Sequence, residues 1–265
     1  MMPIDASSDV TVDRDGGVGV VSIARPQVRN CLNSLVIKLL TALVIELQRD
    51  PNIRSIVITG EGDKAFCAGA DLDELDGLDP AGAQHYIGAG QRLMSAIAQS
   101  DVPVIAAVNG LALGGGFEMA LASTFIVACD GAQFALPETR LGLIPGFGGT
   151  QRLARLVGSP AAAFLSVTGR RLSAARAYEL GVLAIEPMPR ADLMGRVREV
   201  ANDIRASSAR AVAAVLAAQR RGIDGSLANG LALEAQLAAE AISSADGSEG
   251  VAAFLAKRTP EFGSR

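Results

Sequence analysis

Histidine is almost absent from this sequence, with His85 as its one example among 265 residues. A histidine-ligated metal cluster or a Ser-His-Asp triad would have to be built around that single side chain. Because His85 falls in a stretch with helical periodicity, we expect it to face solvent. The scarcity of histidine excludes most catalytic mechanisms that depend on histidine, and it predicts a protein without a metal site.

Cysteine is also scarce, and long apolar runs are missing. The three cysteines, Cys31, Cys67 and Cys129, lie far apart, match no zinc spacing and leave one over after any pairing. The opening residues MMPIDASSDV lack the charged and apolar regions of a signal peptide, and charge or glycine interrupts every apolar run before about eighteen residues. We therefore expect a cytoplasmic protein with neither an export signal nor a membrane span.

Clusters of basic residues are lacking too. The net charge is −4, and lysine and arginine are scattered rather than gathered into a stripe with interleaved aromatic residues. Nucleic acid is therefore not expected as a partner. The composition, with 49% hydrophobic and 20% charged residues, is that of a globular chain that buries a core.

The first part of the chain predicts a hairpin followed by a helix. The apolar runs Val10–Val12 and Val18–Ile23 flank Asp15-Gly16-Gly17, which supplies the positive-φ positions of a tight turn. Asn33 can cap a helix whose apolar residues between Val36 and Leu47 recur at steps of three and four. One face of that helix should pack inward.

Strands and helices then alternate. Ser55–Thr59 and Val104–Val108 are apolar strand-like runs on either side of a helical stretch, Pro80–Ser100. Fully apolar strands alternating with helices indicate a layered α/β fold with covered sheets, whose functional site lies in loops at strand ends.

The end of the chain is almost wholly helical. Helices are expected near 191–205, 209–221, 226–242 and 248–257, separated by serine, glycine or aspartate breaks. We divide the chain into a core, residues 1–190, and a C-terminal helical region, residues 191–265.

A glycine-rich turn forms the first candidate site. Gly114-Gly115-Gly116 follows a strand and opens a helix, so its backbone N–H groups could bind a negatively charged oxygen that approaches closely where no β-carbon stands. Glu118 lies three residues after Gly115 and should project on the same helical face. Alone, the glycines could be a flexible turn and Glu118 an acid in a first helical turn. The spacing of dinucleotide and phosphate loops is absent.

A second acid lies in apolar surroundings. Glu138 follows Pro137 after a probable strand at Gln133–Ala135 and precedes a segment, Leu141–Gly149, with little charge. Two carboxylates in one apolar pocket would have pKa values pushed apart, so that one could accept a proton while the other donates one. Taken locally, Glu138 could equally be a solvated acid at a helix start.

A second turn could supply another backbone donor. Phe66–Leu72 reads as a strand end with small residues at Gly69 and Ala70, where an amide could point outward and complete a two-donor oxyanion hole. Cys67 has no histidine or cation beside it in sequence to lower its pKa. We therefore interpret Cys67 as a small buried residue rather than a nucleophile.

Together these segments resemble the enoyl-CoA hydratase/isomerase, or crotonase, family over nearly the whole chain. The resemblance is carried by the following pieces: Arg25-Pro26, Asn30–Asn33, Ala65–Leu72, Pro103–Glu118, Pro137-Glu138, Gly142, Ile144–Gly146, Gly148–Leu153, Glu249-Gly250, Phe254 and Lys257-Arg258. It implies a spiral of ββα units with a C-terminal helical region that drives assembly into a trimer or a dimer of trimers. It also implies an acyl-CoA substrate, with coenzyme A as part of that substrate and no separate cofactor.

The resemblance assigns roles by motif position. The amides of Ala70 and Gly115 would hold the thioester oxygen, and Glu118 and Glu138 would be the acid/base pair. Contacts with the substrate and coenzyme A would come from Arg29, Ala68, Ala70, Asp71, Leu72, Gly114, Gly115, Pro145 and Gly146. Family members with both glutamates usually hydrate trans-2-enoyl-CoA to 3-hydroxyacyl-CoA.

Two alternatives stay open at this stage. An isomerase could use the same oxyanion hole and one glutamate to move a proton between C2 and C4. A non-catalytic acyl-CoA-binding subunit would keep the pocket but would need no acid pair, and the presence of both glutamates argues against it.

Overall fold

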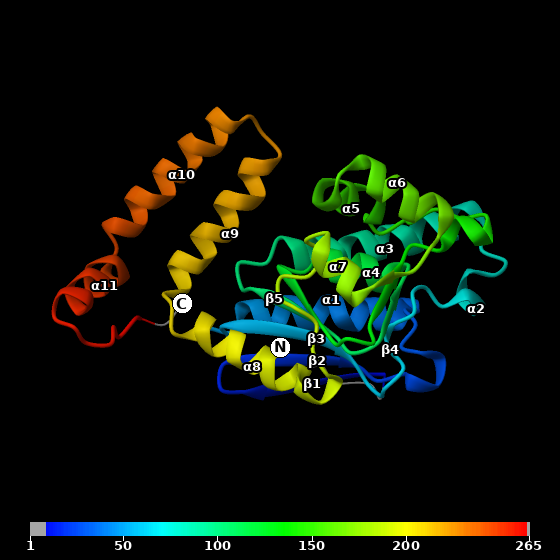
Figure 1. Ribbon diagram of the computed structural model, residues 1–265, viewed down its shortest axis with the longest axis horizontal. Coiled ribbons are helices and arrows are strands. Elements are labelled where there is room, and N and C mark those ends of the chain that lie inside the picture. Colours follow the sequence, from blue (N-terminus) through cyan, green and yellow to red (C-terminus); the bar gives the residue numbers. More distant parts are fainter. Residues whose placement is uncertain (1–8, 264–265) are drawn as a thin grey trace.

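The computed structural model describes residues 9–263 (Figure 1). The opening residues 1–8, which were considered above for an export signal, lie outside this range. Within it, no helix combines the length and the apolar character needed to cross a membrane.

A five-stranded sheet has the order β1-β2-β3-β5-β7. β1 and β2 pair antiparallel, and the other neighbours are parallel. The predicted hairpin is confirmed, with Gly16 and Gly17 at positive φ in its turn. The strands are β1 (Val10–Asp15), β2 (Val18–Ile23), β3 (Ser55–Gly60), β5 (Val104–Val108) and β7 (Phe125–Ala128).

A smaller four-stranded sheet has the order β4-β6-β8-β9. Its strands are β4 (Ala65–Cys67), β6 (Leu111–Leu113), β8 (Gln133–Ala135) and β9 (Leu172–Ser173). Since β4, β6 and β8 are mutually parallel, their carboxyl ends meet at one edge of the sheet. The segments that follow these three strands are therefore brought together.

Helices cover the sheets, and several begin where a side chain caps them. The Asn33 side chain accepts a hydrogen bond from the N–H of Val36, as predicted, and Asp79 does the same for Gly82. The helices up to residue 179 are η1 (Pro26–Val28), α1 (Ser34–Arg49), α2 (Leu72–Leu75), α3 (Pro80–Ala98), α4 (Gly115–Ala122), η2 (Glu138–Leu141), α5 (Gly149–Val157), α6 (Ser159–Thr168) and α7 (Ala174–Glu179).

The C-terminal part is helical as predicted, with α8 (Arg190–Arg205), α9 (Ala209–Ile223), α10 (Leu227–Ile242) and α11 (Ala245–Leu255). The last helix starts earlier than the expected residue 248 because Ser244 caps it by accepting from the N–H of Gly247. Figure 1 shows α9, α10 and α11 reaching away from the body of the protein as an arm.

Each face of the five-stranded sheet has its own core. On one face Leu193 and Val197 of α8 pack with Val57, Ile105 and Val127. The other face belongs to a much larger cluster that includes α1, α3, α4 and the smaller sheet. The helix that opens the C-terminal region is thus part of the body.

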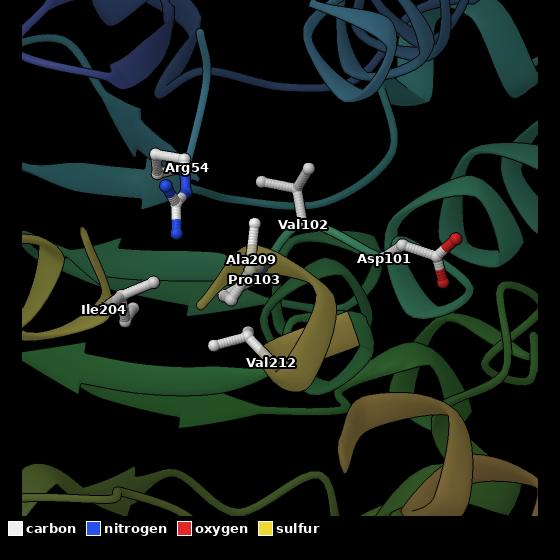
Figure 2. Close-up of a pocket in the computed structure, with 7 residues that line it drawn as sticks. All are labelled: Arg54, Asp101, Val102, Pro103, Ile204, Ala209 and Val212. Carbon is white, nitrogen blue, oxygen red and sulfur yellow. The ribbon is translucent and has the colours of Figure 1, made fainter. Parts of the chain in front are cut away.

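A small crevice of about 10 Å³ lies where the arm leaves the body (Figure 2). Arg54 and Pro103, just before β3 and β5, meet Ala209 and Val212 of α9 there. Arg54 also donates to the carbonyl oxygen of Ser207 at 2.5 Å. This crevice marks the attachment of the arm, at the amino ends of β3 and β5, and contains neither predicted glutamate.

Candidate active site

The glycine turn after β6 leaves one backbone donor open. Gly114 has φ 50° and ψ −126°, a conformation suited to glycine, and its N–H donates to the carbonyl oxygen of Ala135 at 2.9 Å. Gly115 is the first residue of α4, where an amide has no partner within the helix. Its N–H donates no hydrogen bond to any residue in the described range.

The turn after β4 lies directly beside the glycine turn. Gly69 has φ 106°, and a β-carbon on it would stand 3.0 Å from the carbonyl oxygen of Leu113 and 3.6 Å from the nitrogen of Gly115. Ala70 forms a β-bridge with Leu32. In this bridge the N–H of Leu32 donates to the carbonyl oxygen of Gly69, and the N–H of Asp71 donates to that of Leu32. The N–H of Ala70 itself has no partner among residues 9–263. Two open amides thus come from adjoining turns.

A loop at residues 147–149 binds the Glu118 carboxylate and is called below the loop that binds Glu118. The side chain is buried, with 2% of its surface exposed, although it belongs to an otherwise apolar helix. Its Oε1 accepts hydrogen bonds from the N–H groups of Phe147 at 2.8 Å and Gly149 at 2.7 Å. These donors stand where α5 begins, so successive amides and the positive end of a helix dipole face the carboxylate.

Two opposing effects set the protonation of Glu118. Burial raises the pKa of its carboxyl group, because the charged form loses water. The N–H groups of Gly149 and Phe147, then the positive charge of Arg152, and then the N–H of Gly148 lower that pKa. Burial is the largest of these effects, so the pKa of Glu118 is raised overall, while the hydrogen bonds to Oε1 favour its carboxylate form.

Glu138 has a different environment. It is the first residue of η2, after β8, and a β-carbon on Gly114 would lie 2.9 Å from its Oε1. Its Oε2 is buried and has no hydrogen-bond partner among residues 9–263. Burial, together with the nearby charge of Glu118, raises the pKa of Glu138 to about 7. This acid can hold a proton at neutral pH, and its Oε2 lacks the N–H donors that favour the charged form of Glu118.

The structure thus brings the three predicted segments together at the carboxyl ends of β4, β6 and β8. Open amides, a carboxyl group held by N–H donors and a second carboxyl group that can keep a proton at neutral pH are suited to enolate-forming chemistry on a carbonyl compound. No cluster of three or more metal-binding side chains occurs in the range that the structure covers.

Comparison with known proteins identifies the chain. Residues 13–265 match the family model described as enoyl-CoA hydratase/isomerase. The chain belongs to the enoyl-CoA hydratase/isomerase family. A Mycobacterium bovis relative, named "Probable enoyl-CoA hydratase echA8", is 41% identical over 256 residues, which are 96% of this chain and 97% of that protein. The short-chain-enoyl-CoA hydratase of Clostridium acetobutylicum is 36% identical over the same shares.

A solved structure agrees with this assignment. The enoyl-CoA hydratase of Bacillus anthracis superposes with a TM-score of 0.93 at 38% identity, over 96% of this chain and 98% of that one. The predicted crotonase fold is therefore confirmed, as a pair of mixed sheets with a C-terminal helical region.

The residues predicted to contact the substrate and coenzyme A lie on several of these segments. Arg29 is exposed, and its carbonyl oxygen accepts from the N–H of Ala68 at 3.0 Å. The Asp71 carboxylate pairs with Arg25 at 3.0 Å, while Leu72 opens α2 with an exposed side chain.

Pro145 and Gly146 precede the loop that binds Glu118. Pro145 is buried, and the carbonyl oxygen of Gly146 accepts from Gln91 of α3 at 3.0 Å. A β-carbon on Gly146 would stand 2.6 Å from Ile87, also on α3. Gly146, just before the loop that binds Glu118, therefore packs against α3.

The structure adds a packing reason for glycine at 115 to the predicted approach of a substrate oxygen. A β-carbon on Gly115 would stand 3.1 Å from the Phe147 ring and 3.4 Å from Leu32. A side chain there would therefore press against the loop that binds Glu118.

Sequence reasoning missed the groups that hold the active site in place. The amides of Phe147 and Gly149 carry no signature in side-chain type. Arg25 and Asn30 were seen only as parts of a motif, yet Arg25 bonds to both Cys31 and Asp71. Asn30 is fully buried and donates to the carbonyl oxygens of Glu61 and Ala65. Buried polar residues beside the motif were the available signal.

Proposed function

We propose that the protein hydrates a trans-2-enoyl-CoA thioester to a 3-hydroxyacyl-CoA. The observation that carries the proposal is the pair of glutamates beside the open amides of Ala70 and Gly115. Glu118 accepts two backbone hydrogen bonds, whereas Glu138 has a buried oxygen without a partner in the described residues and a pKa raised to about 7. Hydration needs both a proton acceptor and a proton donor. The names of the relatives, including the short-chain-enoyl-CoA hydratase, support the same reaction.

The proposed mechanism uses each group once. The amides of Ala70 and Gly115 bind the thioester oxygen as it gains negative charge, a contribution of about 2.7–4 kcal/mol per donor in other enzymes. A water molecule attacks C3 and gives a proton to the Glu118 carboxylate. Glu138 gives its proton to C2. The added hydroxyl and hydrogen complete the product, and proton exchange with solvent restores the two acids.

Substrate contacts are assigned by the same proposal. Ala68, Gly114, Pro145 and Gly146 adjoin the catalytic groups and would contact the thioester or acyl group. Arg29, exposed at the end of η1, would contact coenzyme A together with Asp71 and Leu72 at the start of α2. The ion pair with Arg25 and the hydrogen bond from the Asp71 N–H to the carbonyl oxygen of Leu32 fix the position of Asp71 at the start of α2.

We further propose that the protein assembles as a trimer or a dimer of trimers. The arm supports this, because it exposes large apolar side chains that a single chain leaves in water. Those exposed by more than 70% are Ile223, Leu227, Ile242, Phe254 and Leu255. Since α8 packs on the body, we expect the contact surface of region 191–265 to lie on α9–α11.

Turnover of a panel of enoyl-CoA thioesters tests the function. We expect water addition to at least one trans-2-enoyl-CoA, detected as loss of the conjugated double bond and as 3-hydroxyacyl-CoA product. Trans-3-enoyl-CoA thioesters belong in the same panel. Double-bond migration without any hydrated product would replace hydration by isomerisation. Binding of every thioester without turnover would indicate an acyl-CoA-binding subunit.

A further inference from the structure

The loop that binds Glu118 is held from its other side by one cationic side chain. Arg152 lies on the first turn of α5, and its Nη1 donates to the carbonyl oxygen of Phe147 at 2.9 Å. Its own N–H donates to the carbonyl oxygen of Gly148, also at 2.9 Å. The guanidinium covers Gly148, which has φ 113° and where a β-carbon would collide with Arg152.

This contact acts on the same peptide unit that faces the carboxylate. The carbonyl of Phe147 and the N–H of Gly148 belong to one planar trans peptide, so they point in opposite directions. Arg152 holds the oxygen end, and the N–H end interacts with Glu118. The N–H groups of Phe147 and Gly149 flank this peptide and bond directly to Oε1. Fixing the oxygen therefore fixes the orientation of the donors.

The charge of Arg152 has no competing partner at close range. No carboxylate among residues 9–263 lies within 4.0 Å of its guanidinium, and the side chain is half-buried. Burial lowers the pKa of Arg152, and the charge of Glu118 raises it again. In a partly buried setting the attraction between these two charges is screened less than at a surface.

Few other ionisable groups face Glu118. Glu138 on η2 interacts with it, and when Glu138 is ionised its negative charge opposes the effect of Arg152. His85 and Arg92, the ionisable side chains of α3 besides buried Tyr86, are exposed, as is Arg155 on α5. The strands packed against α4 contribute only the Cys67 thiol, whose pKa burial raises to about 12.

We propose that Arg152 is a positioning residue for Glu118, which orients the amides at 147–149 and favours the ionised Glu118 carboxylate before it accepts a proton from water. This inference rests on the proposed function for its kinetic consequence. The arrangement of Arg152, the loop and Glu118 does not depend on which thioester is the substrate.

The kinetic test compares variants of two arginines on the same helix. Arg152→Gln is expected to lower kcat by about 10-fold to 100-fold through misplacement of the base, with KM nearly unchanged. The acid limb of the kcat profile, which reports protonation of Glu118, should move to higher pH, because loss of the cation favours the neutral acid. The basic limb, which reports Glu138, should stay. Arg152→Lys should recover most of kcat and the original acid limb.

Arg155→Gln is the matched control, since Arg155 is exposed and, among residues 9–263, donates only to Gln151 of its own helix besides a 3.9 Å pair with Asp224. It should leave the pH profile unchanged. Arg152→Met, an unbranched and uncharged replacement of about the length of glutamine, serves if the glutamine variant fails to fold. An equal loss of kcat at every pH, with the acid limb unmoved, would overturn the proposal. So would an Arg152→Lys variant as impaired as Arg152→Gln.

A spectroscopic titration separates this proposal from the proposed function. The infrared band of the protonated Glu118 carboxyl group can be assigned by its absence from Glu118→Gln. In Arg152→Gln or Arg152→Met this band should persist to higher pH than in the wild type. If the wild type hydrates no thioester but the band shifts, the function fails while the role of Arg152 stands. If the band titrates identically in all variants, the role of Arg152 is wrong whatever the activity.

Discussion

The Cγ atom of Glu118 lies 2.9 Å from the point where a β-carbon on Gly149 would stand. Gly149→Ala should therefore push the carboxylate away from its amide donors and lower kcat by about tenfold or more. Alanine suits the first turn of a helix, so the variant should stay folded. Gly195→Ala on α8 is the control, because its β-carbon would meet nothing within 4 Å. Wild-type turnover in Gly149→Ala would contradict the tight fit around Glu118.

The two glutamates should behave as one catalytic unit. Glu118→Gln and Glu138→Gln keep the side-chain size but remove the base and the titratable acid, so each should lower hydration by about 10²-fold or more. The double variant should be little worse than the poorer single variant, since residues that act together are not additive. Turnover of the best panel substrate and exchange of the C2 proton in D₂O are the measurements. Unchanged hydration in Glu138→Gln would favour a one-glutamate reaction.

Glu138 also makes folding stability depend on pH. Its pKa is about 7 in the folded protein against an ordinary value of 4.5, so between these values the folded chain keeps a proton that the unfolded chain releases. The contribution of Glu138 to the free energy of unfolding is thus fully present below about pH 4.5 and is lost as pH rises through about 7. Glu138→Gln lacks this dependence. The Tm of Glu138→Gln relative to wild type should rise across that window, and a constant difference would show that Glu138 is solvated.

Assembly can be measured directly. Light scattering at micromolar concentration should give the mass of three or six chains, and Phe254→Asp should reduce it, because Phe254 is 83% exposed on α11 and a charge there opposes burial. Val167→Asp on α6, where the side chain is 71% exposed on the body, should leave the mass unchanged. A monomeric wild type would refute the proposed trimer.

The sequence predicted those features whose cause is local. The hairpin follows from Gly16 and Gly17, and the start of α1 follows from Asn33, because turn and cap chemistry act over a few residues. Both glutamates were candidates because they stand beside glycine-rich or apolar segments, and their role as a pair came from the family resemblance. Each of these features can be traced to the printed residues.

What the sequence could not predict depends on distant contacts between main-chain atoms. The bonds from Phe147 and Gly149 to Glu118 span 29 and 31 residues and involve peptide groups that every residue type except proline provides. The smaller sheet was only partly expected, since β4 and β6 are three residues long and too short to show a period. The proposed role of Arg152 depends on these distant contacts, because Arg152 acts on Glu118 through the loop that carries Phe147 and Gly149.

The hydrogen bonds that hold the Glu118 carboxylate are hard to remove by mutation, because peptide N–H groups donate them. Exchanging the side chain of Phe147 leaves its N–H in place, and among the standard amino acids only proline would delete that donor. The same holds for the amides of Ala70 and Gly115. Substitutions that reshape the acyl-binding surface can therefore accumulate around a reacting centre whose hydrogen bonds belong to the backbone. Side-chain replacements around Phe147 and Gly149 thus leave the donors to Glu118 in place unless they introduce proline or displace the loop.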